Sequence, residues 1–102
     1  MRSLSLTGTA ADDIVEQAEW YELRGDTRLS KRWERSVYLS IYRLLRHPHS
    51  GALCTFKSAG LRGIRRAHVP AFPRHLVFYR VENDQITVLR VIHGARDLES
   101  LF

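Results

Sequence analysis

The sequence predicts an α+β fold in which a helical hairpin covers one face of an antiparallel sheet. Apolar residues recur at helical spacing through the first half of the chain, and the period then shortens to the alternation that is typical of strands. Asn83-Asp84 separates two of these strands, and both residue types tolerate the positive φ of a two-residue hairpin turn. We therefore expect the order β-α-α-β-β-β: a short N-terminal strand, a two-helix antiparallel hairpin and a three-stranded antiparallel C-terminal sheet. The length of 102 residues fits a single domain over residues 1–102.

The first strand and the first helix are separated by a break at Gly8-Thr9. Residues 4–7 alternate apolar and polar side chains, as a strand does. Thr9 is the expected N-cap of the helix, because its hydroxyl can accept a hydrogen bond from a free backbone amide. Gly25-Asp26 is expected to end this helix. Acidic side chains near the start suit the positive end of the helix dipole: Asp12, Asp13 and Glu16.

The second helix carries a long apolar stripe, formed by Leu29, Trp33, Val37, Ile41, Leu44 and Leu45. Its cations lie mostly off this stripe: Arg28, Lys31, Arg32, Arg35 and Arg43. Asp26 or Thr27 is the expected N-cap, and the helix must end by His47 because Pro48 disfavours the helical conformation just before it. The short connection makes the two helices antiparallel, with three aromatic residues expected in the core between them: Trp20, Tyr21 and Trp33.

Three strands are expected in the second half, over residues 61–69, 75–82 and 85–92. An irregular connection precedes them at 47–60, and a turn lies at 70–73. The hairpin turn sets four cross-strand pairs: Glu82 with Gln85, Arg80 with Thr87, Phe78 with Leu89, and Leu76 with Val91. Both faces of this hairpin are rich in large apolar residues. One face is expected to take the helices, and the other is either covered by the tail of the chain or left for a partner.

The chain is basic, with a net charge of +5, and 14 of its 16 basic residues are arginine. Residues 51–102 hold 8 basic and 4 acidic side chains, a net of +4, so the positive field is concentrated in the second half. This favours an anionic partner, either nucleic acid or an acidic protein segment. A single cysteine, Cys54, excludes an internal disulfide. No apolar run is long enough to cross a membrane and the N-terminus has no apolar signal core, so we expect a cytoplasmic protein without membrane contact.

The last third of the chain carries a recognisable pattern, made of Leu61–Arg66, Phe78–Val81 and Leu89–Asp97. With the N-terminal strand and helical hairpin, it closely resembles the ParE/RelE superfamily of bacterial toxins from toxin–antitoxin modules, and is most similar to the ParE branch, also called plasmid stabilisation proteins. The resemblance implies a toxin neutralised by a cognate antitoxin, whose extended or helical C-terminal segment wraps around it. ParE-type toxins poison DNA gyrase and block replication, whereas RelE-type toxins cut mRNA in the ribosomal A site.

Two departures from the RelE pattern favour the gyrase-directed function. RelE-type nucleases work without a metal and use strand lysines and arginines with a tyrosine near the C-terminus. Here residues 64–68 contain no lysine and residues 98–102 contain no tyrosine. A toxin that acts by binding needs neither, and no cofactor or metal is expected. Two alternatives stay open: a RelE-like, ribosome-dependent mRNA endoribonuclease, and an inactive member that binds an antitoxin without being toxic.

The candidate site residues occupy matched positions of this pattern, except Arg74, which stands at the start of the strand expected over residues 75–82. If the protein is a nuclease, the catalytic candidates are Arg65, Arg74, His93 and Arg96. The candidates for binding a target or an antitoxin are Arg62, Arg65, Arg66, Phe78, Arg80, Leu89, Arg90, Arg96 and Asp97. In a purely structural alternative, the side chains of Arg80 and Arg90 pair with those of Glu82 and Asp97. If the apolar face is free, Phe78→Asp or Leu89→Asp prevents antitoxin binding, whereas an internal face makes the same changes unfold the chain.

Overall fold

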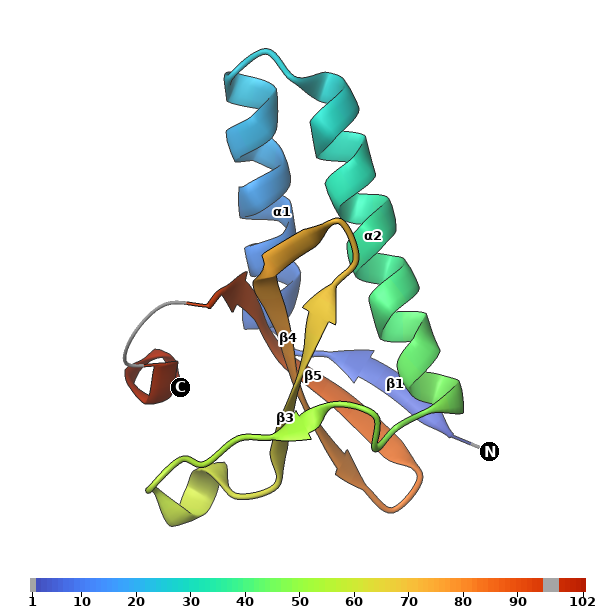
Figure 1. Ribbon diagram of the computed structural model, residues 1–102, viewed down its shortest axis with the longest axis vertical. Helices are drawn as coiled ribbons and strands as arrows, with labels where there is room; N and C mark the ends of the chain where they lie inside the picture. The colour runs from blue at the N-terminus through green and yellow to red at the C-terminus, as the bar shows by residue number, and fades with distance from the viewer. Residues whose placement is uncertain (1, 95–97) are drawn as a thin grey trace.

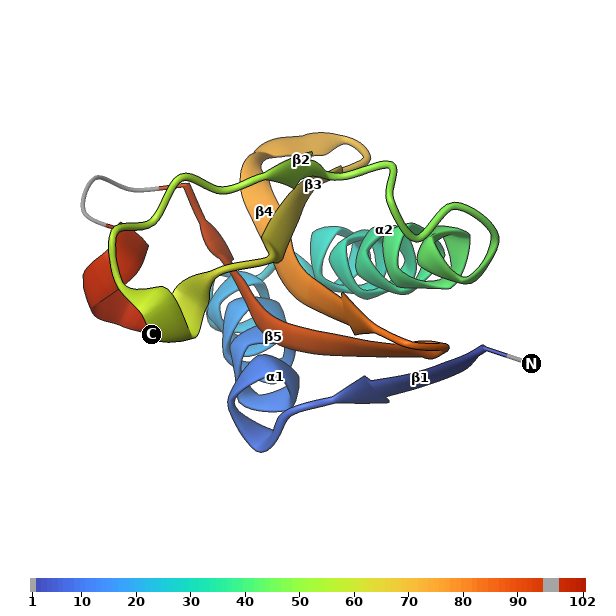
Figure 2. The ribbon, with the colours of Figure 1, turned by 90° about the horizontal axis from the view of Figure 1, so that it is seen from below.

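The computed structural model describes residues 2–94 and 98–102. Two helices, α1 (Gly8–Leu23) and α2 (Thr27–Arg46), run antiparallel and pack on one face of a five-stranded sheet (Figure 1). Two short 3₁₀ turns, η1 (Ala59–Leu61) and η2 (Leu98–Leu101), lie together on the side of the sheet away from α2 (Figure 2). The α+β class and the helical hairpin are as the sequence predicts. Neither helix carries an apolar stretch that could cross a membrane, within the part of the chain that the structure describes.

The sheet is larger than the sequence predicts. Its strands are β1 (Ser3–Leu6), β2 (Ala52–Leu53), β3 (Ile64–Val69), β4 (Phe72–Glu82) and β5 (Gln85–His93). They lie in the order β1-β5-β4-β3-β2, with β1 parallel to β5 and all other neighbours antiparallel. The three expected C-terminal strands are β3, β4 and β5. β1 and β2 extend them at the two edges, through long-range pairing that a local pattern does not reveal.

The hairpin between β4 and β5 contains a β-bulge that the sequence pattern misses. The turn at Asn83-Asp84 is confirmed, with Asn83 at φ 54°, and so are the pairs nearest to it. The register then shifts between Phe78 and Tyr79, so that Phe78 faces Arg90 rather than Leu89. Leu76 likewise faces Ile92 instead of Val91. A bulge adds one residue to one strand and reverses the faces beyond it. Val91 therefore joins the core under the helices, and Ile92 points to the opposite face.

The helix ends are fixed by side-chain caps. Thr7, and not the expected Thr9, is the N-cap of α1, because its Oγ1 accepts a hydrogen bond from the Ala10 amide at 3.0 Å. Asp26 caps α2 as expected, with Oδ1 accepting from the Leu29 amide at 2.9 Å. α2 ends at Arg46, two residues before Pro48, as predicted.

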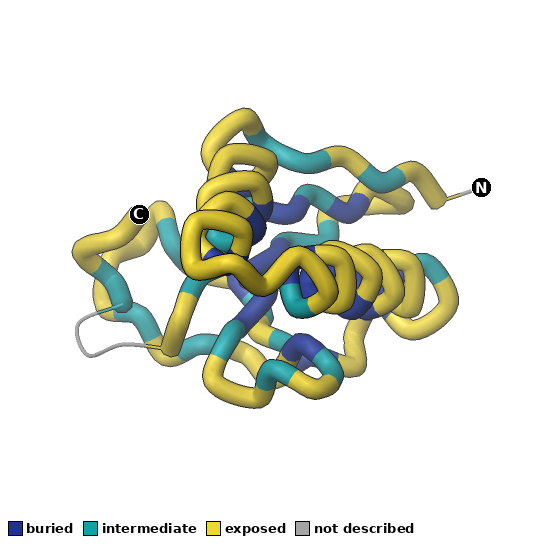
Figure 3. The backbone as a smooth tube through the Cα atoms, turned by 90° about the horizontal axis from the view of Figure 1, so that it is seen from above, coloured by how far each residue is buried: buried dark blue, intermediate teal, exposed yellow. Residues whose placement is uncertain are grey.

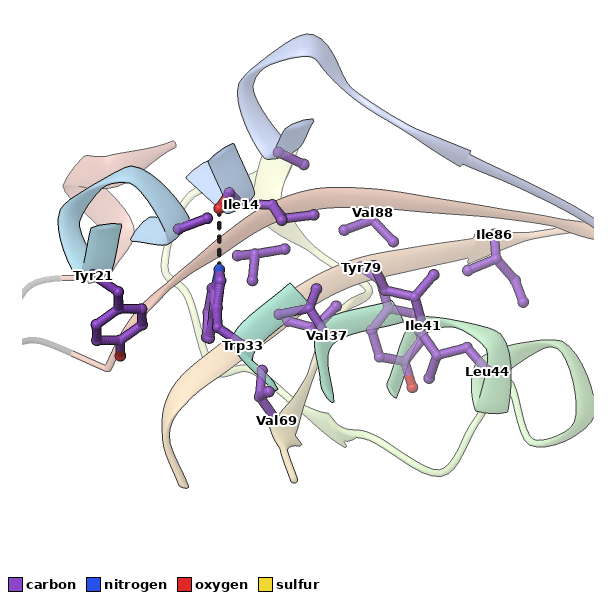
Figure 4. Packing of buried hydrophobic residues seen from close by; sticks show 14 residues of the cluster. Ile14, Tyr21, Trp33, Val37, Ile41, Leu44, Val69, Tyr79, Ile86 and Val88 are labelled. Atoms are coloured by element: carbon purple, nitrogen blue, oxygen red, sulfur yellow. Dashed lines mark hydrogen bonds between the residues drawn. The ribbon is translucent and has the colours of Figure 1, made fainter. Parts of the chain in front are cut away.

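The main core lies between the helical hairpin and the sheet. Buried segments are concentrated on the inner sides of both helices and the central strands (Figure 3). Trp33 is fully buried, and its Nε1 donates a hydrogen bond to the Ile14 carbonyl at 3.0 Å, which ties α2 to α1 (Figure 4). Tyr21 is also buried, as expected. Trp20 is not: it is 47% exposed, with the guanidinium of Arg24 stacked 3.5 Å above its ring.

The opposite face of the sheet has a smaller core of its own, formed by Ile64, Leu76 and Phe78. The tail of the chain covers it, because the ring of Phe102 lies 5.3 Å from that of Phe78 and 5.5 Å from that of Phe56. Leu98 and residues around Cys54 and Leu61 pack against the same core. The sequence left two possibilities for this face: cover by the tail of the chain, or a surface left for a partner. The structure shows that the tail covers it.

Candidate functional site

The arginines of β3 point to opposite sides of the sheet. Arg65 Nη1 donates hydrogen bonds to the carbonyls of Gly51, at 2.7 Å, and His49, at 3.2 Å. Tyr79, its partner on β4, holds the same loop, since its hydroxyl donates to the Pro48 carbonyl and accepts from the Gly51 amide. Arg65 thus has a structural task in fixing the loop after α2, through backbone carbonyls.

Arg66 and Arg62 are the exposed cations of this region. Burial raises the pKa of the Cys54 thiol, and the nearby charge of Arg66 partly opposes that rise. Arg80 is more constrained, because its Nη2 donates to the carbonyls of Gly60, at 2.8 Å, and Arg62, at 3.3 Å. Its expected contact with Glu82 is present at 3.8 Å. Arg62 and Arg66 are therefore the two candidates here whose guanidinium groups are open to a partner.

Arg90 forms a forked ion pair with Asp13 of α1. Its Nε and Nη2 lie 2.8 and 2.9 Å from the two carboxylate oxygens, and the pair raises the pKa of Arg90 above its ordinary value. Nη1 also donates to the carbonyl of Leu101 in η2. The sequence alternative paired this arginine with Asp97, but Asp97 and Arg96 lie outside the described residues. Arg90 thus joins β5, α1 and the C-terminal turn.

The same carboxylate protects an unpaired strand edge. β1 pairs with β5 only along Gln85–Val88, so the outer edge of β5 is open beyond that point. There the Val91 amide donates to Asp13 Oδ2 at 3.0 Å, and the Leu89 carbonyl accepts from the Thr7 hydroxyl at 3.0 Å. A side chain that hydrogen-bonds to the free backbone groups of an edge strand prevents that strand from pairing with a strand of another chain. From the sequence, Asp13 is expected only to interact with the helix dipole. Asp13 directly precedes Ile14, which is buried, and this neighbour is the signal that could have indicated that Asp13 also faces the sheet.

The nuclease candidates do not form one site within the described residues. Arg74 and His93 line a common hollow of about 400 Å³ with His68. Arg65 pairs with Tyr79, five residues further along β4 than Arg74, which corresponds to about 17 Å at the usual rise of a strand. The structure thus brings Arg74 and His93 together and places Arg65 apart from them.

Two histidines lie close together at the end of the sheet. The rings of His75 and His93 are 5.3 Å apart, and His75 also packs 4.7 Å from the ring of Trp33. Burial first, and the charge of His93 second, lower the pKa of His75. The adjoining hollow is lined by charged groups of α1 and β5: Asp13, Glu16 and Arg90. Nowhere in residues 2–94 and 98–102 do three metal-ligating side chains gather closely enough to hold one metal ion.

His75→Gln is expected to flatten the pH dependence of stability on the acid side of pH 6.5. Because the pKa of His75 in the folded chain is lowered from its ordinary 6.5, the unfolded chain binds a proton between these two values that the folded chain does not. The free energy of unfolding of the unmodified chain is therefore fully developed above this window and falls as the pH drops through it. Urea unfolding at several pH values measures the slope, and equal slopes for both chains would contradict the assignment.

The largest feature that the sequence analysis left without a role is a basic surface on α2. Arg28, Lys31, Arg32 and Arg35, named here the α2 stripe, are all exposed and together line one hollow of about 400 Å³. In the sequence they appear only as charges off the apolar stripe. Their spacing of three and four residues was the signal that they share one side of the helix.

Comparisons with known proteins give a family and a fold. Residues 4–98 match the family model of the ParE toxin of the type II toxin–antitoxin system parDE. The sequence has no match among curated proteins. A structure of the chromosomal ParDE system from P. aeruginosa superimposes with a TM-score of 0.75 at 19% identity, covering 93% of this chain and 98% of that chain.

Two further structures are more distant. The YoeB/ParE toxin from Agrobacterium tumefaciens gives a TM-score of 0.57 at 20% identity, over 93% of this chain and 100% of that chain. The DinJ–YafQ toxin–antitoxin complex from E. coli gives a TM-score of 0.53 at 16% identity, over 99% of this chain and 97% of that chain. At such identities these likenesses concern the fold alone. The family match, however, runs from within β1 to the first residue of η2, and the chain therefore belongs to the ParE family of toxins from type II toxin–antitoxin systems.

Proposed function

We propose that this protein acts by binding DNA gyrase and blocking replication, rather than by cutting RNA. One observation carries the choice between these two activities: Arg65 is separated from Arg74 and His93, the other two described candidates for RNA cleavage. Arg65 is bonded to two backbone carbonyls and lies far from Arg74 and His93. Cleavage needs an acid, a base and a phosphate-stabilising cation around one phosphate, whereas a binding toxin needs only a complementary surface. Membership of the ParE family supports the same choice.

A cognate antitoxin is the second proposed partner, and the cytoplasm the proposed location. Two exposed cations, Arg62 and Arg66, lie just before β3 and within β3. They suit an acidic antitoxin segment, because opposite charges steer association. The ParDE and DinJ–YafQ structures of similar fold are described as toxin–antitoxin systems, which adds support.

An mRNA endoribonuclease is the second candidate function. The observation in its favour is the hollow shared by Arg74, His93 and His68, which places a fixed cation beside two imidazole side chains. If this hollow cut RNA, Arg74→Gln or His93→Gln would lower toxicity by orders of magnitude. A binding toxin should lose only a few fold, since binding energy is spread over several residues.

The test is pulse labelling after induced expression in a bacterial host, with thymidine and methionine incorporation followed in the same culture. The gyrase proposal predicts that DNA synthesis stops first while translation persists, and that purified protein inhibits supercoiling by gyrase. Earlier collapse of translation, abolished by His93→Gln, would establish the nuclease instead. Soluble protein without effect on either process would indicate an inactive member that only binds an antitoxin.

A further inference from the structure

The α2 stripe is an arrangement that folding alone does not favour. Cations three or four residues apart on a helix repel each other, and the stripe begins in the first turn of α2, where the helix dipole is already positive. No acidic residue lies in that first turn. Glu34 is the one acidic residue of α2, against six basic residues in the same helix. This concentration of charge is suited to binding an external anion.

The nearby carboxylates do not neutralise the stripe. Asp26 lines an adjoining hollow with Arg28 and Arg32, but its Oδ1 is bonded to the Leu29 amide as the helix cap. Among the residues that the structure describes, the two salt bridges are those of Arg80 and Arg90, and neither involves the stripe. All four cations are thus free to bind a ligand.

We propose that the α2 stripe binds the phosphate backbone of duplex DNA. Three of its four members are arginines, whose forked donors match phosphate oxygens. The four residues that line the hollow between them are all cations, so the hollow concentrates positive charge. Such a surface suits a nucleic acid, because the affinity of a nucleic acid for a protein comes largely from charge and from the release of counterions. Contacts to phosphates carry no base information, so binding is independent of sequence.

The choice of DNA over RNA rests on the proposed function, because gyrase holds duplex DNA while it works. The geometry is compatible with this choice. The four cations extend over about 11 Å of a single straight helix surface, at 1.5 Å per residue. B-form DNA has a major groove wide enough for a helix, whereas the narrow major groove of an RNA duplex excludes one.

Fluorescence anisotropy of a labelled mixed-sequence DNA duplex, titrated with the purified chain between 50 and 200 mM salt, tests the proposal. Four phosphate contacts predict a slope of about −3.6 for log K against log salt, which is about a 150-fold loss of affinity across this range. R28Q/K31Q/R32Q/R35Q is expected to remove most of that slope. K31Q/R35Q is expected to reduce its magnitude by about 1.8.

A matched control is R2Q/K57Q, which removes one arginine and one lysine outside the stripe and is expected to leave the slope as it was. Circular dichroism establishes that every variant is folded. The proposal is overturned if the unmodified chain does not bind, if R2Q/K57Q lowers the slope as far as K31Q/R35Q, or if an RNA duplex or a polyglutamate peptide binds the stripe more tightly. The anisotropy assay contains no gyrase, so it is independent of the proposed target. If the protein failed to inhibit supercoiling, gyrase would be refuted as the target, but the measured DNA binding would still stand.

Discussion

Phe78→Asp is expected to leave the chain unfolded in water at 25 °C. Phe78 is fully buried in the smaller core, beside Ile64 and Leu76 and under the ring of Phe102. Removal of a buried phenylalanine ring costs about 3–5 kcal/mol, and an unpaired carboxylate in its place adds a desolvation penalty. The total approaches the whole free energy of unfolding of a small domain, about 5–15 kcal/mol. Far-UV circular dichroism and urea titration measure the loss.

Leu89→Asp is the companion variant on the same face. Leu89 is only half-buried, at the bulge, so the expected cost is about 1–2 kcal/mol and the chain stays folded. A Phe78→Asp chain with an unchanged urea midpoint would show that the tail does not cover this face. The folded Leu89→Asp chain is therefore the one to use in antitoxin capture experiments. If the Leu89→Asp chain still captured the antitoxin tightly, the surface around Leu89 would not be part of the antitoxin interface.

Asp13→Ala is expected to lower the free energy of unfolding by about 2–4 kcal/mol. The carboxylate is 8% exposed and accepts three hydrogen bonds, two from Arg90 and one from the Val91 amide. Without it, a partly buried guanidinium loses its counter-charge and an edge amide loses its acceptor. Urea unfolding measures the change. The effect should persist in 0.5 M salt, because salt screens partly buried pairs weakly.

Asp12→Ala provides the control for this change. Asp12 is the preceding residue of α1 and is exposed, so its removal takes away the same charge from the same helix turn without the three hydrogen bonds. It should alter the free energy of unfolding by no more than about 0.5 kcal/mol. Similar losses in the two variants would mean that the charge near the helix dipole matters, and not the forked pair.

The features of the fold that the sequence predicts correctly are those with a local cause. The turn at Asn83-Asp84 depends on two residues that tolerate positive φ, and the end of α2 depends on Pro48. The parallel pairing of β1 with β5 joins segments about 80 residues apart, and no local pattern encodes it. The bulge opposite Phe78 is likewise set by packing on both faces, so the predicted alternation fails beyond it.

The arginines among the site candidates can be picked out in the sequence, but their contacts cannot. All of them are charged in the sequence, and only the contacts distinguish them. Arg65 and Arg80 bind backbone carbonyls that lie 14 to 20 residues away in the chain. The partner of Arg90 is 77 residues away on α1. Such pairs depend on the tertiary fold, which composition and spacing do not specify.

The helical hairpin extends well beyond the sheet, so that the turn joining α1 and α2 is the most remote point of the molecule in Figure 1. The α2 stripe begins just after this turn, whereas Arg62 lies between η1 and β3 and Arg66 lies within β3. The protein therefore presents two separate groups of exposed cations, one on α2 and one at β3. If the antitoxin binds at Arg62 and Arg66 and a polyanion binds at the α2 stripe, as proposed above, we expect a ternary complex to form. An antitoxin bound only at the sheet would neutralise the toxin by blocking access of the large target, and not by covering the tip.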